Sequence, residues 1–343
     1  MSTPIEKLPG ALLSWYERCK RDLPWRADRE PYHVWLSEIM LQQTRVEAVR
    51  GYYTRFLQRL PTIESLANAD PDELNKLWEG LGYYSRVRNL QKAAKVIVEE
   101  HSGVFPRNYD AVRALPGIGD YTAGAVCSIC FELPTPAVDG NVLRVCARVA
   151  EDFAPITDPK VKKALSAQLA GIYPAGRCGA FTQSLMELGA TVCVPNGAPK
   201  CELCPCAGFC VAKANDTAAR LPVKAAKKER RVEDKTVFLL RCGDDWAVVK
   251  RPGRGLLAGL WAFPNVEGHL DAQQALDQLA AWGTHPRELL KMVEKLHIFT
   301  HVQWNLRGFY VECDGRPEIF TWVTREKLEA EIALPTAFRQ FWE

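Results

Sequence analysis

Two acidic side chains, Glu38 and Asp139, stand in surroundings that suit the two roles needed to cleave a glycosidic bond. Glu38 lies in VWLSEIMLQQT, where apolar neighbours should raise its pKa and keep it protonated as a general acid. Asp139 lies in TPAVDGNVLRV just before an amphipathic helix, whose free N–H groups and dipole should favour the ionised form. One neutral and one charged carboxyl group make a pair suited to an oxocarbenium-like transition state. A solvated glutamate and a plain helix cap are the alternatives, because sequence spacing does not show that the two groups meet.

A Pro-Gly-x-Gly turn within LPGIGDYTAGAV is the most specific local pattern in the first half of the chain. Gly117 and Gly119 would let bare backbone N–H groups approach an anion at the start of the second helix. A DNA phosphate fits that description. An ordinary turn between antiparallel helices is the alternative, and the pattern alone favours neither.

Five of the 12 cysteines fall between Cys193 and Cys210. In a reducing compartment such a cluster indicates a metal site rather than disulfides. Gaps of seven, two and five residues separate Cys193, Cys201, Cys204 and Cys210, and four thiolates so spaced can bind zinc or an iron–sulfur cubane. The single C-x-x-C knuckle favours a cluster over zinc, and Cys206 is a fifth candidate ligand.

The elements that must position these residues change character along the chain. Residues 10 to about 190 read as amphipathic helices, which include Tyr32–Gln58, Asp72–Trp78, Arg88–Glu100 and Pro159–Ile172. Residues 236–343 instead contain short runs rich in β-branched and aromatic residues, such as TVFLLR and EIFTWV. Between them, residues 221–235 carry six Lys and Arg against three acids. We therefore expect an all-α domain at 1–220, a basic linker at 221–235 and an α/β or α+β domain at 236–343.

Composition limits the class of protein. A chain of 343 residues with 47% hydrophobic residues can bury two separate cores. It has no apolar run of the roughly 20 residues that span a bilayer, and its start does not resemble a secretory signal. A net charge of +3 is too small to indicate a nucleic-acid partner by itself. We expect a soluble, cytoplasmic protein that binds no membrane.

Six motifs, taken together and in order, resemble those of the helix-hairpin-helix DNA glycosylase superfamily, and in detail its MutY-type adenine DNA glycosylases. They are LPWR, LSEIMLQQT, WEGLGYYSRVRNL, LPGIGDYTAGA, VDGNVLRV and FTQSLMELGA. The resemblance implies a multidomain fold. Its all-α glycosylase domain would carry the hairpin at 109–126 and a [4Fe-4S] loop at 193–210, followed by an α+β MutT (Nudix)-like domain.

The resemblance also implies a catalytic role for three residues. Glu38 would protonate adenine N7 and then activate water. Asp139 would stabilise the cationic sugar or form a transient bond to it, and Tyr121 would support Asp139. Where the related endonuclease III group has a nucleophilic lysine, this chain has Tyr121, and a phenol cannot form a Schiff base. A monofunctional glycosylase is therefore expected.

Further roles follow from the same resemblance. Gln183 would hold the extruded adenine, and Gln43 with Tyr83 would wedge into the duplex. Contacts with DNA or substrate are implied for Arg26, Gly117 and Gly119, and ligation of the [4Fe-4S] cluster for Cys193, Cys201, Cys204 and Cys210. The first cysteine gap is one residue longer than the six of the family.

The C-terminal domain resembles the MutT-like module of the same enzymes through KRPGRGLLAGLWAFPN. The stretch that follows has no R-E-x-x-E-E pattern for magnesium, so we expect binding rather than hydrolysis. The family's F-S-H loop for 8-oxoguanine corresponds to Phe299, Thr300 and His301, although Phe299 in a core and His301 at a strand end are alternatives.

The expected function is hydrolysis of adenine from its mispair with 8-oxoguanine or guanine in double-stranded DNA, by a monomer in the bacterial cytoplasm. Three alternatives remain at this point. They are an endonuclease III-like glycosylase/lyase acting on oxidised pyrimidines, a non-catalytic iron–sulfur DNA-binding protein, and a nucleotide hydrolase centred on the C-terminal domain.

Overall fold

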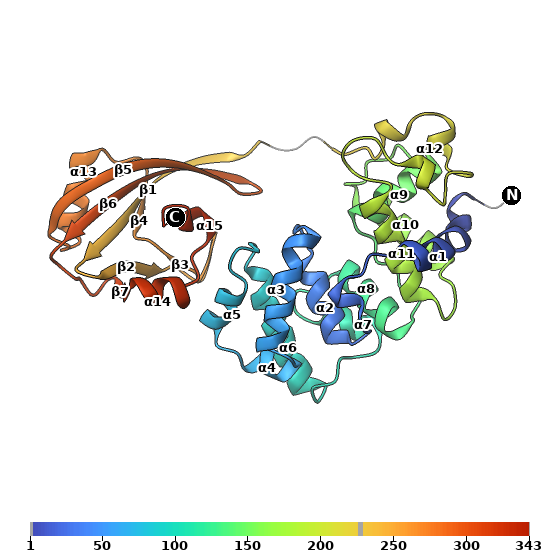
Figure 1. Cartoon of the computed structure of the whole chain (residues 1–343), viewed down its shortest axis with the longest axis horizontal. Coiled ribbons are helices and arrows are strands. Elements are labelled where there is room, and N and C mark those ends of the chain that lie inside the picture. The colour runs from blue at the N-terminus through green and yellow to red at the C-terminus, as the bar shows by residue number, and fades with distance from the viewer. Residues whose placement is uncertain (1–2, 226–228, 343) are drawn as a thin grey trace. The chain divides into compact units, whose positions relative to one another are not determined.

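The computed structural model describes residues 3–225 and 229–342 and divides into two compact units (Figure 1). The first unit comprises Met1–Asn68 and Asn89–Ala226, and the second comprises Ala69–Arg88 and Lys227–Glu343. The short segment Ala69–Arg88 therefore belongs with the C-terminal half, which the sequence did not indicate. Each unit is described by itself below.

The first unit is helical, as predicted. Its α-helices are α1 (Leu8–Cys19), α2 (Pro31–Met40), α3 (Val46–Arg59), α4 (Ile63–Asn68), α6 (Ser85–Glu100, which begins in the second unit), α7 (Tyr109–Ala114), α8 (Asp120–Phe131), α9 (Gly140–Ala150), α10 (Pro159–Ala170), α11 (Cys178–Thr191) and α12 (Val211–Ala214). Short 3-10 turns are η1 (Ile5–Lys7), η2 (Pro24–Arg26), η3 (Cys201–Leu203) and η4 (Ala218–Arg220).

The single helix predicted over Tyr32–Gln58 is wrong, because the chain breaks it into α2 and α3. Gln43 adopts a left-handed conformation with φ 60°, which ends the first helix and redirects the chain. The intervening residues contain neither glycine nor proline, so the apolar period continues across the break without a local signal.

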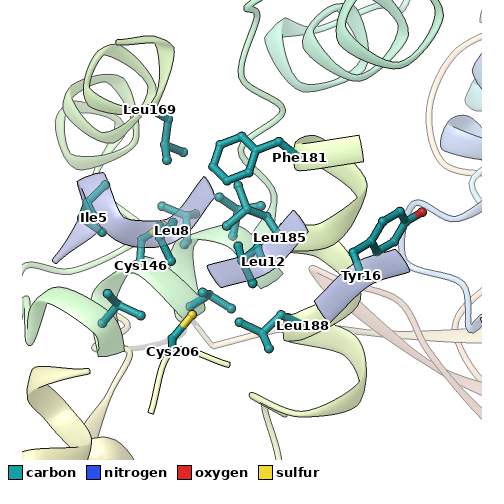
Figure 2. Close-up of a cluster of buried hydrophobic side chains, with 14 of the residues drawn as sticks. Ile5, Leu8, Leu12, Tyr16, Cys146, Leu169, Phe181, Leu185, Leu188 and Cys206 are labelled. Atoms are coloured by element: carbon teal, nitrogen blue, oxygen red, sulfur yellow. The ribbon is translucent and has the colours of Figure 1, made fainter. Parts of the chain in front are cut away.

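Helix α11 lies at the centre of the first unit and packs against α1, α8 and α9. Figure 2 shows its Phe181, Leu185 and Leu188 beside Leu8 and Leu12, in a cluster of buried side chains. Each buried apolar side chain stabilises the fold by about 25 cal/mol per Å² of apolar area removed from water, so this contact surface holds α11 in place. This core therefore holds α11, which carries Gln183, together with α9, which begins directly after Asp139.

The second unit is built on a seven-stranded sheet. Its strands are β1 (Arg231–Cys242), β2 (Asp245–Lys250), β3 (Trp261–Ala262), β4 (Asn265–Glu267), β5 (Pro286–Ile298), β6 (Val302–Cys313) and β7 (Thr321–Thr324). The order is β3-β2-β1-β6-β5, with β4 paired to β1 and β7 to β2. Only the β1–β6 pair is parallel among the described strands.

Helices cover both faces of this sheet. Alternate residues of β1 point to opposite sides: Phe238 and Leu240 pack with α13 (Ala272–Ala281), while Val237 and Leu239 pack with α14 (Arg325–Ala330) and α15 (Thr336–Arg339). Burial on both faces explains why TVFLLR reads as a continuous apolar run. The remaining helix of this unit is α5 (Pro71–Leu77). The α+β expectation is confirmed.

Strand β1 begins earlier than the sequence indicated. Residues 231–235 fall within the expected linker, yet they pair in register with β6, from Arg231 against Val302 to Lys235 against Leu306. The Lys235 side chain is only 4% exposed and bonds Glu267. The prediction of a solvated linker is therefore wrong for residues 231–235, because strand pairing and ion pairs bury part of this charged run. No helix in the described part of the chain is long and apolar enough to span a membrane.

Candidate active site

A cavity of about 670 Å³ in the first unit brings together six of the side chains predicted to act on the substrate. Its lining includes Glu38, Asp139, Tyr121, Gln183, Arg26 and Gln43. Cavities of roughly 300–1,000 Å³ are typical of sites that enclose a small organic molecule. The two acids, which are 101 positions apart in the sequence (139 − 38), therefore face one space.

Glu38 projects from α2, and only 6% of the residue is exposed. Burial raises the pKa of its carboxyl group to about 7, and the nearby Asp139 adds to the rise, whereas a hydrogen bond from Tyr121 and the charge of Arg26 oppose it. The carboxyl group is thus substantially protonated near neutral pH, as a general acid must be. This matches the environment expected from its apolar neighbours.

Asp139 caps α9, as its position before the helix predicted. Its Oδ1 accepts a 2.8 Å hydrogen bond from the backbone N–H of Val142, and its Oδ2 accepts a 2.7 Å bond from Nδ2 of Asn141. Burial nevertheless raises the pKa of Asp139, and these hydrogen bonds only oppose that rise. The helix terminus therefore reduces a penalty of burial rather than lowering the pKa below its ordinary value.

Tyr121 contacts a different acid from the one expected. Its hydroxyl donates a hydrogen bond to Oε2 of Glu38 from the first turn of α8, whereas the resemblance implied support of Asp139. Burial raises the pKa of the phenol well above its ordinary value, so it is a neutral donor. Its role here is to hold the Glu38 carboxyl group.

A second polar cluster contributes Arg21, Arg26, Gln183 and Glu187 to the same cavity, and it was largely missed. The buried carboxylate of Glu187 binds Arg21 and Arg26, and the hydroxyl of Tyr16 donates a 3.1 Å hydrogen bond to Oε1 of Gln183. Glu187 stands four positions after Gln183, so both occupy one face of α11. That spacing was an available signal.

Asn141 was also missed, although it follows Asp139 by two positions at the start of a helix. Helix α11 comes close to it at Gly189, where an added Cβ would lie 2.5 Å from the Cβ of Asn141. Glycine at this position permits the approach that leaves Asn141 beside the aspartate. Arg144, which is buried, then donates a 2.7 Å hydrogen bond to Oδ1 of Asn141.

The predicted hairpin is formed by α7 and α8. Gly117 has φ 75°, and an added Cβ would lie 2.5 Å from the side chain of Asn89. Gly119 is the N-cap of α8. Because glycine has no side chain, the N-cap residue makes no hydrogen bond to the first backbone N–H groups of the helix. An added Cβ at Gly119 would meet nothing within 4 Å. The turn thus presents bare backbone at a helix N-terminus, as an anion site requires.

Four cysteine side chains, Cys193, Cys201, Cys204 and Cys210, line one small cavity. Cys206 is completely buried in the apolar cluster shown in Figure 2 and does not line that cavity. Among the described residues, no three His, Cys, Asp or Glu side chains come close enough together to hold one metal ion.

The remaining predicted residues belong to the second unit. Phe299, Thr300 and His301 form the turn between β5 and β6, closed by a 2.8 Å bond from the Phe299 N–H to the Val302 carbonyl. Phe299 packs its ring against Trp304 at 4.9 Å, so the core alternative applies to this residue. Tyr83, which is 49% exposed, has its hydroxyl 2.6 Å from Oγ1 of Thr300.

Two family models match the chain. Residues 36–170 match the HhH-GPD superfamily of base excision DNA repair proteins, and residues 236–343 match the NUDIX domain. The first range contains Glu38, Tyr121 and Asp139, and the second contains the β5–β6 turn.

Curated relatives extend over both units. The chain is 36% identical to the adenine DNA glycosylase of Homo sapiens over 400 residues, which cover 96% of this chain and 72% of the relative. It is 38% identical to the adenine DNA glycosylase of Arabidopsis thaliana, over 90% of this chain and 57% of the relative. With that of Buchnera aphidicola subsp. Baizongia pistaciae, identity is 34% over 84% of this chain and 80% of the relative.

Solved structures agree on the helical fold. A thermostable thymine-DNA glycosylase superposes with a TM-score of 0.56 at 29% identity, covering 62% of this chain and 97% of that one. A trapped endonuclease III–DNA covalent intermediate gives a TM-score of 0.53 at 24% identity, covering 63% and 99%, which supports the fold alone. Together with the two acids that share one cavity, these findings identify a DNA glycosylase of base excision repair: the chain belongs to the adenine DNA glycosylase family.

Proposed function

We propose that the protein hydrolyses the N-glycosidic bond of adenine mispaired with 8-oxoguanine, or with guanine, in duplex DNA. The observation that carries the proposal is the pair of carboxyl groups, Glu38 and Asp139, on one cavity of about 670 Å³. The names of the relatives support adenine as the base. Because no side chain reaches a glycosidic bond inside stacked DNA, the nucleotide must first be extruded from the duplex.

In the proposed reaction the protonated carboxyl group of Glu38 donates its proton to N7 of the extruded adenine. The C1′–N9 bond then breaks, and adenine leaves as a neutral base with the bonding electrons. The ionised carboxylate of Asp139 stabilises the positive charge that develops on the sugar. Glu38, now ionised, accepts a proton from the water that attacks C1′, which leaves an abasic site and restores the acid.

Tyr121 supports hydrolysis rather than strand cleavage. It lines the cavity and donates its hydroxyl to Glu38, and a phenol offers no amine to form a Schiff base with the sugar. Borohydride should therefore trap no covalent enzyme–DNA adduct in appreciable yield. Efficient trapping would instead favour a glycosylase/lyase and would remove Tyr121 from this role.

We further propose that Cys193, Cys201, Cys204 and Cys210 hold a [4Fe-4S] cluster. Four thiols line one cavity, and their spacing, with a single C-x-x-C knuckle among them, favours the cubane over zinc. Arg148 also donates a 3.3 Å hydrogen bond to Sγ of Cys193, which suits a thiolate ligand. When bound, the cluster would tie the loop at 193–210 together and supply no chemistry to base release.

Recognition of 8-oxoguanine is assigned to the β5–β6 turn with Tyr83. Thr300 and His301 stand at the end of a hairpin whose base is fixed by Phe299, so their polar groups are exposed on a rigid support. The hydroxyl of Thr300 provides the hydrogen-bonding group that serine provides in the family's F-S-H loop. A monomer in the cytoplasm stays a prediction.

The deciding experiment is a single-turnover base-release assay on duplexes that pair adenine with 8-oxoguanine, guanine or thymine, alongside a duplex with an oxidised pyrimidine. Release of adenine, fastest opposite 8-oxoguanine, supports the proposal; release of the pyrimidine alone contradicts it. Glu38→Gln should lose base release by at least about 10³-fold while it still binds the duplex. Wild-type rates in that variant would remove the general-acid assignment.

A further inference from the structure

Glu187 is a fully buried carboxylate that the proposed reaction does not use. None of its side chain is exposed, and it accepts hydrogen bonds from Nε of Arg21 at 2.7 Å, Nη2 of Arg21 at 3.0 Å and Nη2 of Arg26 at 2.8 Å. The backbone N–H of Arg21 donates a fourth bond, at 3.1 Å. The two arginines hold the pKa of Glu187 below its ordinary value despite its burial. A buried ionised carboxylate with four donors is a fixed point of the structure.

The arginine that Glu187 holds is connected to the residue proposed to bind the base. The guanidinium of Arg26 lies 5.6 Å from the ring centroid of Tyr16, and the Tyr16 hydroxyl bonds Oε1 of Gln183. Arg26 is further fixed by a 3.1 Å bond from its Nη1 to the Arg21 carbonyl. Glu187 therefore helps to fix two residues that line the cavity: Arg26 directly, and Gln183 through Arg26 and Tyr16.

Charge gives Glu187 a second effect, on the general acid. Glu38 faces Tyr121 and Cys130 from α8, Asp139 from the start of α9, and Arg26 from η2. Arg26 is the cation among these groups, and its charge lowers the pKa of Glu38. Beside Arg26, Glu187 faces the phenol of Tyr16 and the cation Arg21. Without the carboxylate, the positive charge of Arg26 would act on Glu38 uncompensated.

We propose that Glu187 is a positioning residue of the base-binding cavity, which fixes Arg26 against Tyr16 and Gln183 and offsets its charge at Glu38. This inference rests on the proposed function, because it concerns how the same cavity binds and protonates the base. It assigns to a group that touches no reacting atom an effect on both the rate of base release and its pH dependence.

The test is Glu187→Gln, which keeps the shape of the side chain and removes its charge. In single-turnover release from the adenine:8-oxoguanine duplex we expect a loss of about 10- to 100-fold. The alkaline limb of the pH–rate profile should also move to lower pH, by roughly half a unit, because the pKa of Glu38 falls. Glu187→Asp, which keeps the charge, should leave the limb where the wild type has it.

Glu17→Gln is the matched control, because it removes the carboxylate of an exposed ion pair with Arg177 and should change neither quantity. If Glu187→Gln does not fold, Arg26→Gln tests the same electrostatic link, since loss of the cation should move the limb to higher pH. A limb that stays fixed in the folded variant, or in Arg26→Gln, overturns the inference even if the rate falls. Absence of adenine release by the wild type would instead refute the proposed function.

Discussion

The hydroxyl of Tyr121 on α8 donates a hydrogen bond to the carboxyl group of Glu38 on α2, although the two residues are 83 positions apart in the sequence. A donor aimed at a carboxyl group favours its ionised form, and burial favours its protonated form. Burial is the larger effect and raises the pKa of Glu38 to about 7, and the hydrogen bond from Tyr121 keeps it from rising further. The acid is therefore poised to give up a proton and to take one back within one catalytic cycle.

Removing this donor should shift the pH dependence of base release. In Tyr121→Phe the pKa of Glu38 rises above about 7, because the hydrogen bond that lowers it is lost. The alkaline limb of the single-turnover profile should move to higher pH. Tyr32→Phe is a suitable control, since it removes a buried hydroxyl that donates only to the Leu60 carbonyl in the described structure, away from the cavity. An unmoved limb would show that the phenol does not tune the acid.

Glu38 should also make the folded protein less stable at alkaline pH. Its pKa rises from about 4.5 to about 7 on folding, so the cost of ionising it in the folded state is absent below pH 4.5 and complete above pH 7. At pH 8, Glu38→Gln should therefore have a free energy of unfolding roughly 3 kcal/mol higher than that of the wild type, as measured by denaturant titration. At pH 4.5 the two proteins should have about the same free energy of unfolding. A difference independent of pH would contradict the raised pKa.

The two glycines of the hairpin should differ in their contribution to stability. Gly117→Ala places a side chain at φ 75° and against Asn89, which should cost about 1–3 kcal/mol of unfolding free energy. Gly119→Ala meets open space and should cost less than about 1 kcal/mol, while it covers backbone that the sequence predicts to contact a DNA phosphate. Thermal unfolding and duplex affinity, measured together, separate the two effects. Equal destabilisation by both variants would refute this assignment.

Serine variants test the cluster ligands. Cys204→Ser should lose much of the visible absorption and the iron content expected of an iron–sulfur protein, because one of the four thiolates around the cavity is gone. Cys206→Ser should keep both, since Cys206 is buried outside that cavity, and should lose only packing stability. The same loss in both variants would add Cys206 to the ligand set.

Contact between Tyr83 and Thr300 predicts a shared effect on the choice of opposite base. Tyr83→Phe keeps the ring and removes the hydroxyl that lies 2.6 Å from Thr300, so it should reduce the preference for adenine opposite 8-oxoguanine over guanine, about 3- to 10-fold. Thr300→Val should act in the same direction, and the double variant should not add the two effects. Additive losses would mean that the hydroxyl groups act separately.

Much of the site could be predicted from the sequence because its motifs are local. Glu38 and Asp139 were found from their immediate neighbours, and the N-cap of α9 follows from a single residue type at a helix start. The strands of the second unit that alternate or are buried on both faces were likewise expected. Strand β5 was largely missed, because half-exposed charged and apolar residues along it give no clear period.

Features that depend on three-dimensional packing were not predictable in this way. The hydrogen-bond partner of Tyr121 depends on how α8 packs against α2, and the local sequence does not determine that packing. The break at Gln43 has no turn residue to announce it. Burial, which overrides the helix terminus in setting the pKa of Asp139, is a property of the assembled unit.

Gly189 places a steric constraint on the active site although glycine has no side chain to react. Any larger residue there would press on Asn141 and move the amide that bonds Asp139. A side chain at residue 189 would therefore disturb Asp139 indirectly, through Asn141. We therefore expect a substitution at residue 189 to slow base release, as we expect of a substitution of Asp139 itself.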